Sequence, residues 1–393
     1  MSRFHSYINT AVSILSVYTG NEPFATFIKK YFAANRKHGS GDRKIISHLC
    51  YCYFRAARIF EEDRPDEKIV KSLYLCSTEQ HPALADLKPV WNEKVQLTTA
   101  EKLHILDINK PVSVLFPFSD QLSRNIDTEA FALSLLKQPD LYIRVRPGLM
   151  QNVLYKLNDA SIPFSARSAN CIAIPNSTKI EEVIELNREA VIQDYNSQRV
   201  GEMMELVKKQ VSATKLNVWD CCAASGGKSI MAKDILGDIR LMVSDKRATS
   251  IANLKKRFSE AGITGYTSLV IDLEDLKSLQ QSLHQKKFSL IIADVPCTGS
   301  GTWSRTPEQF FWFDRNKLNV YASLQKKIIS NVITYLQPGG HLLYITCSVF
   351  EKENEGVVDF MQNNLHLSPV KTELFRGYDK KADTLFASLL TKL

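Results

Sequence analysis

Two cysteines stand in motifs whose residue types could do chemistry. Cys297 lies in residues 294–302 (DVPCTGSGT), and Cys347 lies in residues 344–355 (YITCSVFEKENE). Each cysteine comes just after an apolar run of strand length, so both are expected at the ligand-binding edge of a sheet. The thiolate is the nucleophilic form of cysteine. The pair therefore predicts thiol chemistry on a molecule bound beside a cofactor.

A turn of small residues precedes these motifs, at residues 222–228 (CAASGGK), between an expected strand and an expected helix. Small residues let the backbone approach a ligand, and a helix N-terminus offers free amide donors. The turn has neither the GxxxxGK[ST] spacing of a phosphate-binding loop nor the GxGxxG spacing of a dinucleotide-binding loop. Asp245 and Asp272 follow the next two expected strands, where they can bind a ribose and an adenine amine. This set favours S-adenosylmethionine over ATP.

Alternating strands and helices after residue 201 must position these groups. Strands are expected at residues 217–220, 240–244, 267–271, 290–294 and 341–346, and helices at residues 228–236, 248–261, 276–284 and 318–336. Short apolar strands separated by helices are typical of a parallel sheet with helices on both faces. The expected fold class is therefore α/β, with ligands at the carboxyl ends of the strands.

The residues before this region divide into two further parts. Apolar residues at three- and four-residue spacing predict helices at residues 8–18, 23–34, 44–58 and 67–76, and Asp42 could cap the third of them. Alternating residues predict a small α+β unit, with strands at 142–147, 162–166, 171–175 and near Val191, and helices at 153–158 and 180–186. The predicted domains are residues 1–125, 126–190 and 191–393.

The composition is that of a globular chain. Of the 393 residues, 44% are hydrophobic and 23% are charged, which excludes a disordered, collagen-like or coiled-coil protein. No apolar run approaches the roughly 18 residues of a membrane span, and the N-terminus has no signal-peptide pattern, so we expect a cytoplasmic protein without membrane contact. None of the eight cysteines forms a CxxC pair, so we expect no metal site.

The charge is compatible with a polyanionic partner but does not require one. The net charge is +8, and a moderate basic excess suits nucleic acid. Basic residues gather around a Gly-Ser-Gly turn in the N-terminal part, where they could contact phosphates: Lys29, Lys30, Arg36, Lys37, Arg43 and Lys44.

Taken together, these motifs resemble those of the RsmB/Nop/Sun family of RNA cytosine-5 methyltransferases. The family motifs CAAPGGK, Asp, Asp, DAPCSGxG and STCSxxxxENExVV correspond to residues 222–228, Asp245, Asp272, 294–301 and 346–358. Residues 193–198 (QDYNSQ) resemble the segment that opens the family's catalytic domain, residues 383–390 resemble its closing strand, and residues 39–55 resemble its NusB-like helical domain. The chain departs from the family pattern at four places: Ser225 for Pro, Val295 for Ala, Ile345 for Ser, and Thr384-Leu385 for Gly-Phe.

The resemblance implies a Rossmann-like, S-adenosyl-L-methionine-dependent methyltransferase domain, preceded by a NusB-like RNA-binding domain and a small α+β domain. The residues alone do not distinguish the two cysteines. By resemblance Cys347 is the nucleophile that adds to carbon 6 of cytosine, and Cys297 assists product release. Asp294 would bind the cytosine, and Lys228 would stabilise a thiolate or contact the base. The implied cofactor-binding residues are Cys222, Ala223, Ala224, Ser225, Gly226, Gly227, Lys228, Asp245, Asp272 and Asp294.

The expected substrate is a cytosine in RNA, with small-subunit ribosomal RNA ahead of transfer RNA. A target base must leave its stack, and aromatic residues often receive such bases, so we expect Trp303 and Arg305 on the substrate side. A DNA cytosine-5 methyltransferase would carry an FxGxG motif and a Pro-Cys-Gln motif, which are absent here. A non-catalytic RNA-binding assembly factor on the same fold is the remaining alternative, and it has no need of both cysteines. We expect a monomer.

Overall fold

The structure is a computed structural model, and it describes residues 2–109, 112–210 and 215–392. The chain forms two compact units. One comprises Met1–Gln138 together with Thr302–Arg315, and the other comprises Pro139–Gly301 together with Asn316–Leu393. The short segment Thr302–Arg315 therefore belongs to the first unit, although the residues before and after it in the sequence belong to the second.

The first unit is helical, as the apolar spacing predicts. Its central helix, α3, runs over Ser40–Ala56 and contacts α1, α4 and α15. Asp42 lies inside α3 rather than before it, and its Oδ2 accepts a hydrogen bond from the Gly39 amide over 3.2 Å. The helices are α1 (Arg3–Val17), α2 (Phe24–Ala34), α3, α4 (Pro65–Cys76), α5 (Pro82–Leu87), α6 (Pro89–Glu93), α7 (Thr99–Ile105), α8 (Thr128–Ser134) and α15 (Pro307–Phe311).

The second unit begins with a small antiparallel sheet of strand order β2-β3-β1-β4, against which one helix packs. The predicted helix at residues 180–186 is only a 3₁₀ turn, Ile180–Glu182. The predicted strand at 162–166 is displaced to Ser165–Ser168. The elements are β1 (Leu141–Val145), α9 (Met150–Asp159), β2 (Ser165–Ser168), β3 (Cys171–Ile174) and β4 (Ala190–Ile192).

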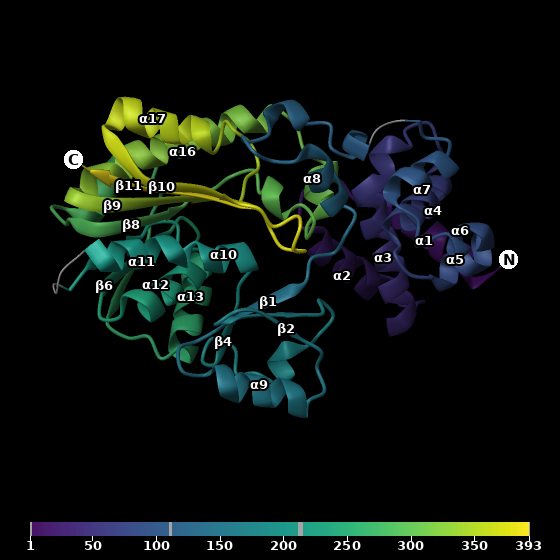
Figure 1. Ribbon diagram of the computed structural model, residues 1–393, viewed down its shortest axis with the longest axis horizontal. Helices are drawn as coiled ribbons and strands as arrows, with labels where there is room; N and C mark the ends of the chain where they lie inside the picture. Colours follow the sequence, from purple (N-terminus) through teal and green to yellow (C-terminus); the bar gives the residue numbers. More distant parts are fainter. Residues whose placement is uncertain (1, 110–111, 211–214, 393) are drawn as a thin grey trace. The chain divides into compact units, whose positions relative to one another are not determined.

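A seven-stranded sheet forms the body of the second unit, with the order β10-β11-β9-β8-β5-β6-β7 (Figure 1). The five strands from β9 to β7 are parallel, but β11 is antiparallel to β9 and β10 is antiparallel to β11. The parallel arrangement expected for the five predicted strands is therefore confirmed, and the two antiparallel strands β10 and β11 at one end make the whole sheet mixed. The strands are β5 (Asn217–Asp220), β6 (Arg240–Asp245), β7 (Tyr266–Val270), β8 (Phe288–Asp294), β9 (Leu336–Thr346), β10 (Leu367–Phe375) and β11 (Leu385–Lys392).

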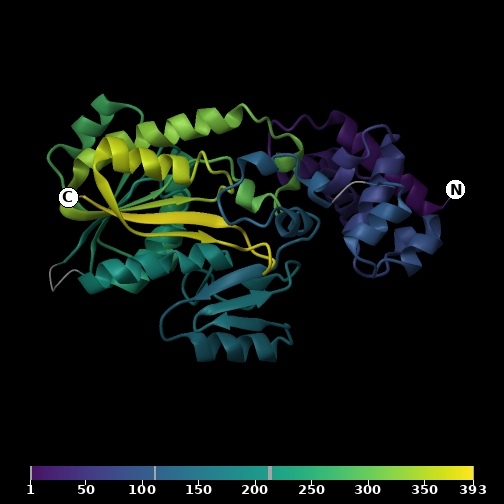
Figure 2. The same ribbon diagram turned by 45° about the horizontal axis from the view of Figure 1, so that its top comes forward.

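Figure 2 shows β10 and β11 side by side at the end of the sheet. The sequence predicts β11 but not β10. Strand β10 contains Pro369 at an irregularity in its pairing, and most of its residues are only partly buried. Such an edge strand lacks the continuous apolar run by which the other strands are recognised.

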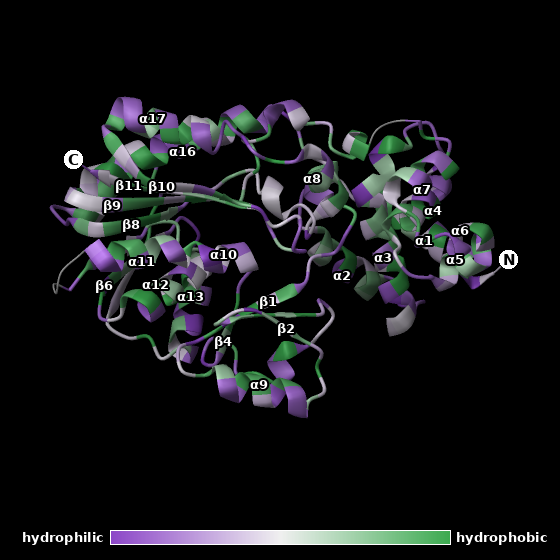
Figure 3. Cartoon of the chain, in the orientation of Figure 1, coloured by the Kyte–Doolittle hydropathy of each residue, from purple (hydrophilic) through white to green (hydrophobic). Residues whose placement is uncertain are grey.

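Helices cover both faces of the large sheet, as expected for this fold class. The apolar side chains of α11, α12 and α13 pack with alternate strand residues such as Val218 and Ile292, and those of α14, α16 and α17 pack with the neighbouring residues Trp219 and Ile291. Strand β8 is hydrophobic along most of its length (Figure 3). The helices are α10 (Tyr195–Arg199), α11 (Gly201–Gln210), α12 (Gly227–Leu236), α13 (Ala248–Glu260), α14 (Leu276–Leu283), α16 (Lys317–Val332) and α17 (Glu355–Leu365). Within the described ranges, no helix is both long and apolar enough to cross a membrane.

Candidate active site

Cys297 and Cys347 lie in contact at the carboxyl edge of the large sheet. They follow the neighbouring parallel strands β8 and β9, in which Asp294 pairs with Ile345. The loops after the two strands therefore start side by side, and the Sγ atoms of Cys297 and Cys347 are 3.3 Å apart. Both cysteine residues are of intermediate burial.

Backbone contacts join the two cysteine loops. The Gly301 amide donates to the Cys347 carbonyl over 2.8 Å, and the Val349 amide donates to Ser300 Oγ over 2.9 Å. A Cβ at Gly301 would lie 1.9 Å from the Thr384 carbonyl oxygen and 3.0 Å from that of Cys347. Only glycine fits at this crossing, so the glycine of the Cys297 motif sets how closely the loops approach.

The buried side chain of Glu353 joins the same two loops by accepting hydrogen bonds from both. It accepts hydrogen bonds from the Thr298 amide (2.9 Å), Thr298 Oγ1 (2.5 Å), Ser348 Oγ (2.5 Å) and Gln325 Nε2 (2.9 Å). Thr298 and Ser348 are the residues that directly follow the two cysteines. The sequence does not reveal this role, because a glutamate among other acidic residues gives no sign of partners 55 and 28 residues away.

Burial and hydrogen bonding determine the protonation of these groups. The hydrogen bond with Cys347 and burial raise the pKa of the Cys297 thiol well above its usual range. Burial also raises the pKa of Glu353, although the hydrogen bonds from Ser348 and Thr298 lower it in part. Cys297 is therefore a protonated thiol at neutral pH, able to donate to the Cys347 sulfur.

Asp294 and Lys228 form an ion pair at the same edge. Asp294 ends β8, Lys228 is in the first turn of α12, and the Lys228 Nζ lies 3.2 Å from Asp294 Oδ2. The Lys228 Nζ also donates to Ser197 Oγ over 2.7 Å, which brings the predicted segment 193–198 to the site. The Lys228 side chain is only 10% exposed, so its charge is directed inward rather than held in solvent.

The small-residue turn lies between β5 and α12, and Asp245 holds it. Asp245 Oδ2 accepts from the Ala224 amide over 3.0 Å, and Asp245 Oδ1 accepts from the Arg247 amide over 2.9 Å. Gly226 has φ +84°, and a Cβ there would lie 2.7 Å from the ring of Phe258 on α13. The turn is thus pressed against α13 on one side and held by the end of β6 on the other.

Asp272 follows β7 and is engaged by Lys246. The Lys246 Nζ lies 2.6 Å from Asp272 Oδ2, and the Glu274 amide donates to Asp272 Oδ1 over 3.0 Å. Partial burial by itself raises the pKa of Asp272, but Lys246 and this amide lower it more. Asp272 is therefore an ionised carboxylate, about a third exposed, with one oxygen bound by a flexible lysine.

Asp220, at the end of β5, is a second buried carboxyl group that the sequence analysis did not single out. Its side chain is fully buried, and Oδ2 accepts from Ser229 Oγ over 2.5 Å. Among the described residues, its Oδ1 has no hydrogen-bond partner. Burial raises the pKa of Asp220 to about 7. The available signal was a charged residue that ends an apolar strand immediately before the turn.

The expectation that Trp303 faces a substrate is wrong. Trp303 belongs to the first unit, is 1% exposed, and packs against Phe116, Phe310 and Phe313 with ring centroids 6.3, 5.4 and 4.8 Å away. Its sequence position, shortly after the Cys297 motif, does not reveal that it fills an aromatic core. Arg305 is only partly buried, and its role stays a prediction.

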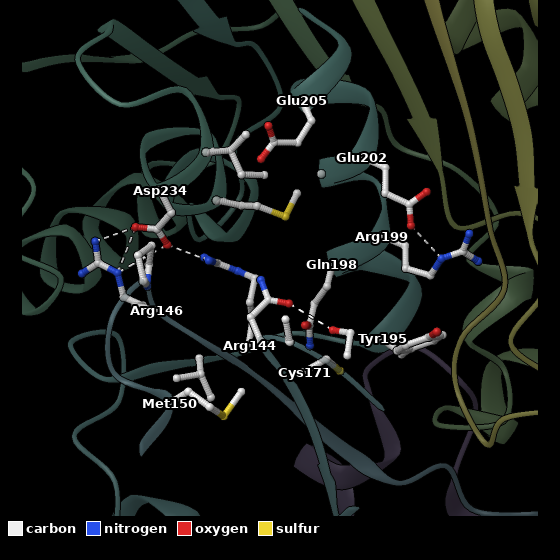
Figure 4. Close-up of a pocket in the computed structure, with 18 of the residues that line it drawn as sticks. Arg144, Arg146, Met150, Cys171, Tyr195, Gln198, Arg199, Glu202, Glu205 and Asp234 are labelled. Atoms are coloured by element: carbon white, nitrogen blue, oxygen red, sulfur yellow. Dashed lines mark hydrogen bonds and ion pairs between the residues drawn. The ribbon is translucent and has the colours of Figure 1, made fainter. Parts of the chain in front are cut away.

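A separate cavity of about 520 Å³ in the second unit contains neither active-site cysteine (Figure 4). Several of the charged groups that line it form ion pairs. Asp234 of α12 lies between two guanidinium groups, 2.6 Å from Arg144 Nη1 and 2.8 Å from Arg146 Nη2. Both arginines come from β1 and its end, so these ion pairs join the small sheet to the helix that carries Lys228.

Known proteins share this arrangement of elements. Residues 178–387 match the family model described as 16S rRNA methyltransferase RsmB/F. The chain is 28% identical over 145 residues to ribosomal RNA small subunit methyltransferase F of Shewanella loihica, covering 37% of this chain and 29% of that protein. It is 27% identical over 164 residues to ribosomal RNA small subunit methyltransferase B of Proteus mirabilis, covering 42% and 36%. The chain thus matches about a third of the length of each relative.

Two solved structures have a similar fold. One is described as PH0851, with a TM-score of 0.69, 18% identity and 97% of each chain covered. The other is NSun6 from Pyrococcus horikoshii with SFG, an analogue of S-adenosylmethionine, with a TM-score of 0.57 and 16% identity over 72% of this chain and 98% of that one. These two similarities show the fold, and the family model shows that the fold is that of a methyltransferase.

Proposed function

Because the chain belongs to the 16S rRNA methyltransferase RsmB/F family, we propose that it methylates carbon 5 of a cytosine in RNA and takes the methyl group from S-adenosyl-L-methionine. The observation that carries this proposal is the 3.3 Å contact between Cys297 and Cys347 at the sheet edge beside the small-residue turn. The names of the family and of the relatives favour small-subunit ribosomal RNA as the substrate.

The paired thiols fit a covalent mechanism. Carbon 5 of cytosine is a poor nucleophile until a thiolate adds to carbon 6, which converts the ring to an enamine. We assign this addition to Cys347, as the resemblance to the family implies, and the hydrogen bond with Cys347 and burial raise the pKa of the Cys297 thiol, which suits a proton donor. After methylation a base must take the proton from carbon 5. The electron pair of that C–H bond then forms the double bond between carbons 5 and 6, and the bond between carbon 6 and sulfur breaks with its electron pair returning to Cys347. A protonated Cys297, 3.3 Å away, can donate to the departing sulfur and so assist release.

The turn has the features that the cofactor requires. A Cβ at Gly227 would meet no atom within 4 Å, so the turn borders open space. Asp245 and Asp272 carry carboxylate acceptors at this edge, which suit ribose hydroxyls and an adenine amine. The binding set we propose is Cys222, Ala223, Ala224, Ser225, Gly226, Gly227, Lys228, Asp245, Asp272 and Asp294. When bound there, S-adenosylmethionine supplies an electrophilic methyl group.

Asp294 and Lys228 are proposed to orient the cytosine. The Asp294 side chain is 33% exposed, so its carboxylate can accept from the exocyclic amine of a base. Lys228 Nζ, bound to both Asp294 and Ser197, holds that carboxylate in place. Asp294 is thus positioned to select cytosine, whose amine is a donor, over uracil, whose carbonyl oxygen is an acceptor.

The first unit is proposed to bind RNA within the domain at residues 1–125, which precedes the domains at 126–190 and 191–393. Lys29, Lys30, Arg36, Lys37 and Lys44 are exposed, and Arg43 is partly buried. Of these, Lys30 pairs with Glu22, whereas Lys29, Lys37 and Lys44 have no carboxylate partner among the described residues. Reversing the charges of Arg36, Lys37, Arg43 and Lys44 should weaken RNA binding and flatten its salt dependence, because fewer counterions are released. An unchanged salt slope would remove this edge from the RNA site.

The proposed activity is tested in two steps. Calorimetry with S-adenosylmethionine should show binding of one cofactor, and incubation with labelled cofactor and unmodified small-subunit ribosomal RNA should incorporate methyl groups at cytosine. Mapping of methylcytosines in RNA from a deletion strain then identifies the base. Incorporation into transfer RNA alone would redirect the substrate, and cofactor binding without any methylation would favour a non-catalytic assembly factor.

A further inference from the structure

The proposed cofactor turn is held in an unusual backbone shape. Ala224 has φ +46° and Gly226 has φ +84°, so left-handed residues stand on both sides of Ser225. Alanine is disfavoured in this region, because its Cβ approaches the following carbonyl oxygen. The related family motif has proline at position 225, which restricts the backbone by itself. Serine supplies no such restriction, so the contacts of Ser225 must supply it here.

Arg257 of α13 makes those contacts. Its Nη1 donates to the Ser225 carbonyl over 3.0 Å and to Ser225 Oγ over 2.7 Å. The same guanidinium group therefore binds the main chain and the side chain of the one residue that departs from the motif. Leu254 and Phe258, on the same helix, lie against Gly226, so α13 contacts the turn at both Ser225 and Gly226.

The guanidinium group is itself fixed from the other side by the small sheet's last loop. Arg257 Nε donates to Asn187 Oδ1 over 2.9 Å, and Asn187 Nδ2 donates to Glu260 Oε2 over 2.7 Å. The Asn187 amide donates to the Ala190 carbonyl over 2.7 Å, at the start of β4. Arg257 is therefore held in one orientation rather than extended into solvent, and it can act as a fixed clamp on the turn.

We propose that Arg257 is a positioning residue for S-adenosylmethionine. Its hydrogen bonds to Ser225 restrict the backbone of the turn, as proline does at this position of the family motif. It acts through Ser225 and does not itself need to touch the cofactor. The inference rests on the proposed function, since it assumes that this turn binds the cofactor. It predicts that Arg257 is needed only while residue 225 is serine.

The test uses the full chain and four variants: Arg257→Met, Ser225→Pro, the double variant Ser225→Pro/Arg257→Met, and Lys256→Ala. Calorimetry measures the Kd for S-adenosylmethionine, and a filter assay measures the Kd for RNA. Arg257→Met should raise the cofactor Kd about tenfold and leave the RNA Kd unchanged. The double variant should return to within about twofold of the wild-type cofactor Kd. Lys256→Ala removes a neighbouring, largely exposed charge from the same helix and should change neither constant.

Several outcomes would overturn the inference. One is a wild-type cofactor Kd in Arg257→Met, and another is failure of the double variant to recover when Ser225→Pro alone binds normally. Weakening of both the cofactor and the RNA by Arg257→Met would indicate a general folding defect and would also overturn it. If Ser225→Pro alone prevents binding, Ser225→Ala decides, because loss of its Oγ bond should raise the cofactor Kd by less than Arg257→Met does. Absence of binding by the wild-type chain would instead contradict the proposed function.

Discussion

Glu353 lies behind the cysteine loops and Asp220 behind the proposed cofactor turn, and both side chains are fully buried. Glu353 accepts two hydrogen bonds on each carboxylate oxygen. Asp220 accepts one, from Ser229, and its Oδ1 has no partner among the described residues. An unpaired buried polar atom is costly, so Asp220 retains a proton more readily, with its pKa raised to about 7 by burial.

This difference separates two kinds of local structure within one sheet edge. Buried hydrogen bonds join the cysteine loops to one another, both directly and through Glu353. The turn is held by two residues outside it, Asp245 and Arg257. It also follows the end of β5, where Asp220 Oδ1 has no hydrogen-bond partner among the described residues. Substitutions in the first region should therefore abolish chemistry, and those in the second should change affinity or pH dependence.

The largest expected effect separates the two cysteines. Cys347→Ala cannot form the bond to carbon 6, so it should lose methylation and trap no RNA. Cys297→Ala can still attack and methylate, but it should stall before release and leave protein joined to RNA through Cys347. A denaturing gel after incubation with RNA and S-adenosylmethionine shows the adduct as a retarded, nuclease-sensitive band.

The matched control is Cys171→Ala, which removes a buried thiol of the small sheet and should retain activity. A retarded band with Cys347→Ala alone would reverse the two roles. Full activity in either active-site variant would exclude the two-thiol mechanism.

The second largest effect is expected at Glu353, the buried residue that joins the two cysteine loops. Glu353→Ala leaves the Thr298 amide without its acceptor and leaves Gln325 Nε2 with only the Pro296 carbonyl. Each hydrogen bond lost by a buried group costs about 1–3 kcal/mol. The free energy of unfolding should fall by about 3 kcal/mol or more, measured by urea denaturation. Glu353→Gln should be milder, because the hydroxyls of Thr298 and Ser348 can rotate to accept. Asp359→Asn, at an exposed position on α17, serves as the control; equal stability of all three variants would show that Glu353 does not hold the loops.

The same physical reasons explain what the sequence could and could not predict. Strands β5 and β6 are apolar runs bounded by polar residues, and their predicted bounds are correct to within one residue. Register then places the ends of β8 and β9 side by side, so the proximity of the cysteines follows from topology. Strand β10 was missed because the signal of an edge strand is weak, and α10 and α11 were not predicted either.

Side-chain partners were the least predictable part. Glu353, Asp220 and Arg257 become significant only through residues brought close by folding, and the chain carries no local sign of those contacts. Trp303 shows the opposite error, since an aromatic residue near a catalytic motif packs into a core as readily as it stacks on a base. Motif spacing thus indicates which residues meet at the sheet edge, whereas burial and hydrogen bonding decide which of them are held and which are free to act.

Asp220→Asn should raise the free energy of unfolding at neutral pH, whereas Glu353→Ala should lower it. The pKa of Asp220 is raised from 3.8 to about 7, so the folded state binds more protons than the unfolded state between these values. Stability from this group is therefore present at low pH and is lost as pH rises through about 7. Relative to wild type, the variant should gain on the order of a few kcal/mol between pH 5 and pH 8, since each pKa unit is worth about 1.4 kcal/mol. Parallel pH profiles of the urea midpoint would show that Asp220 is ionised in both states.

The smallest expected effect is on cofactor affinity at Asp245. Its Oδ2 accepts from the Ala224 amide and its Oδ1 from the Arg247 amide, so it holds the turn as well as facing the proposed ribose site. Asp245→Ala should weaken S-adenosylmethionine binding by about 1–3 kcal/mol, the cost of losing charge-assisted hydrogen bonds. Asp245→Asn keeps an acceptor for the Ala224 amide but loses the charge, so calorimetry should place it between wild type and Asp245→Ala. Unchanged affinity in Asp245→Ala would remove Asp245 from the ribose site, whereas equal losses in both variants would mean that the negative charge, rather than the hold on the turn, accounts for the effect.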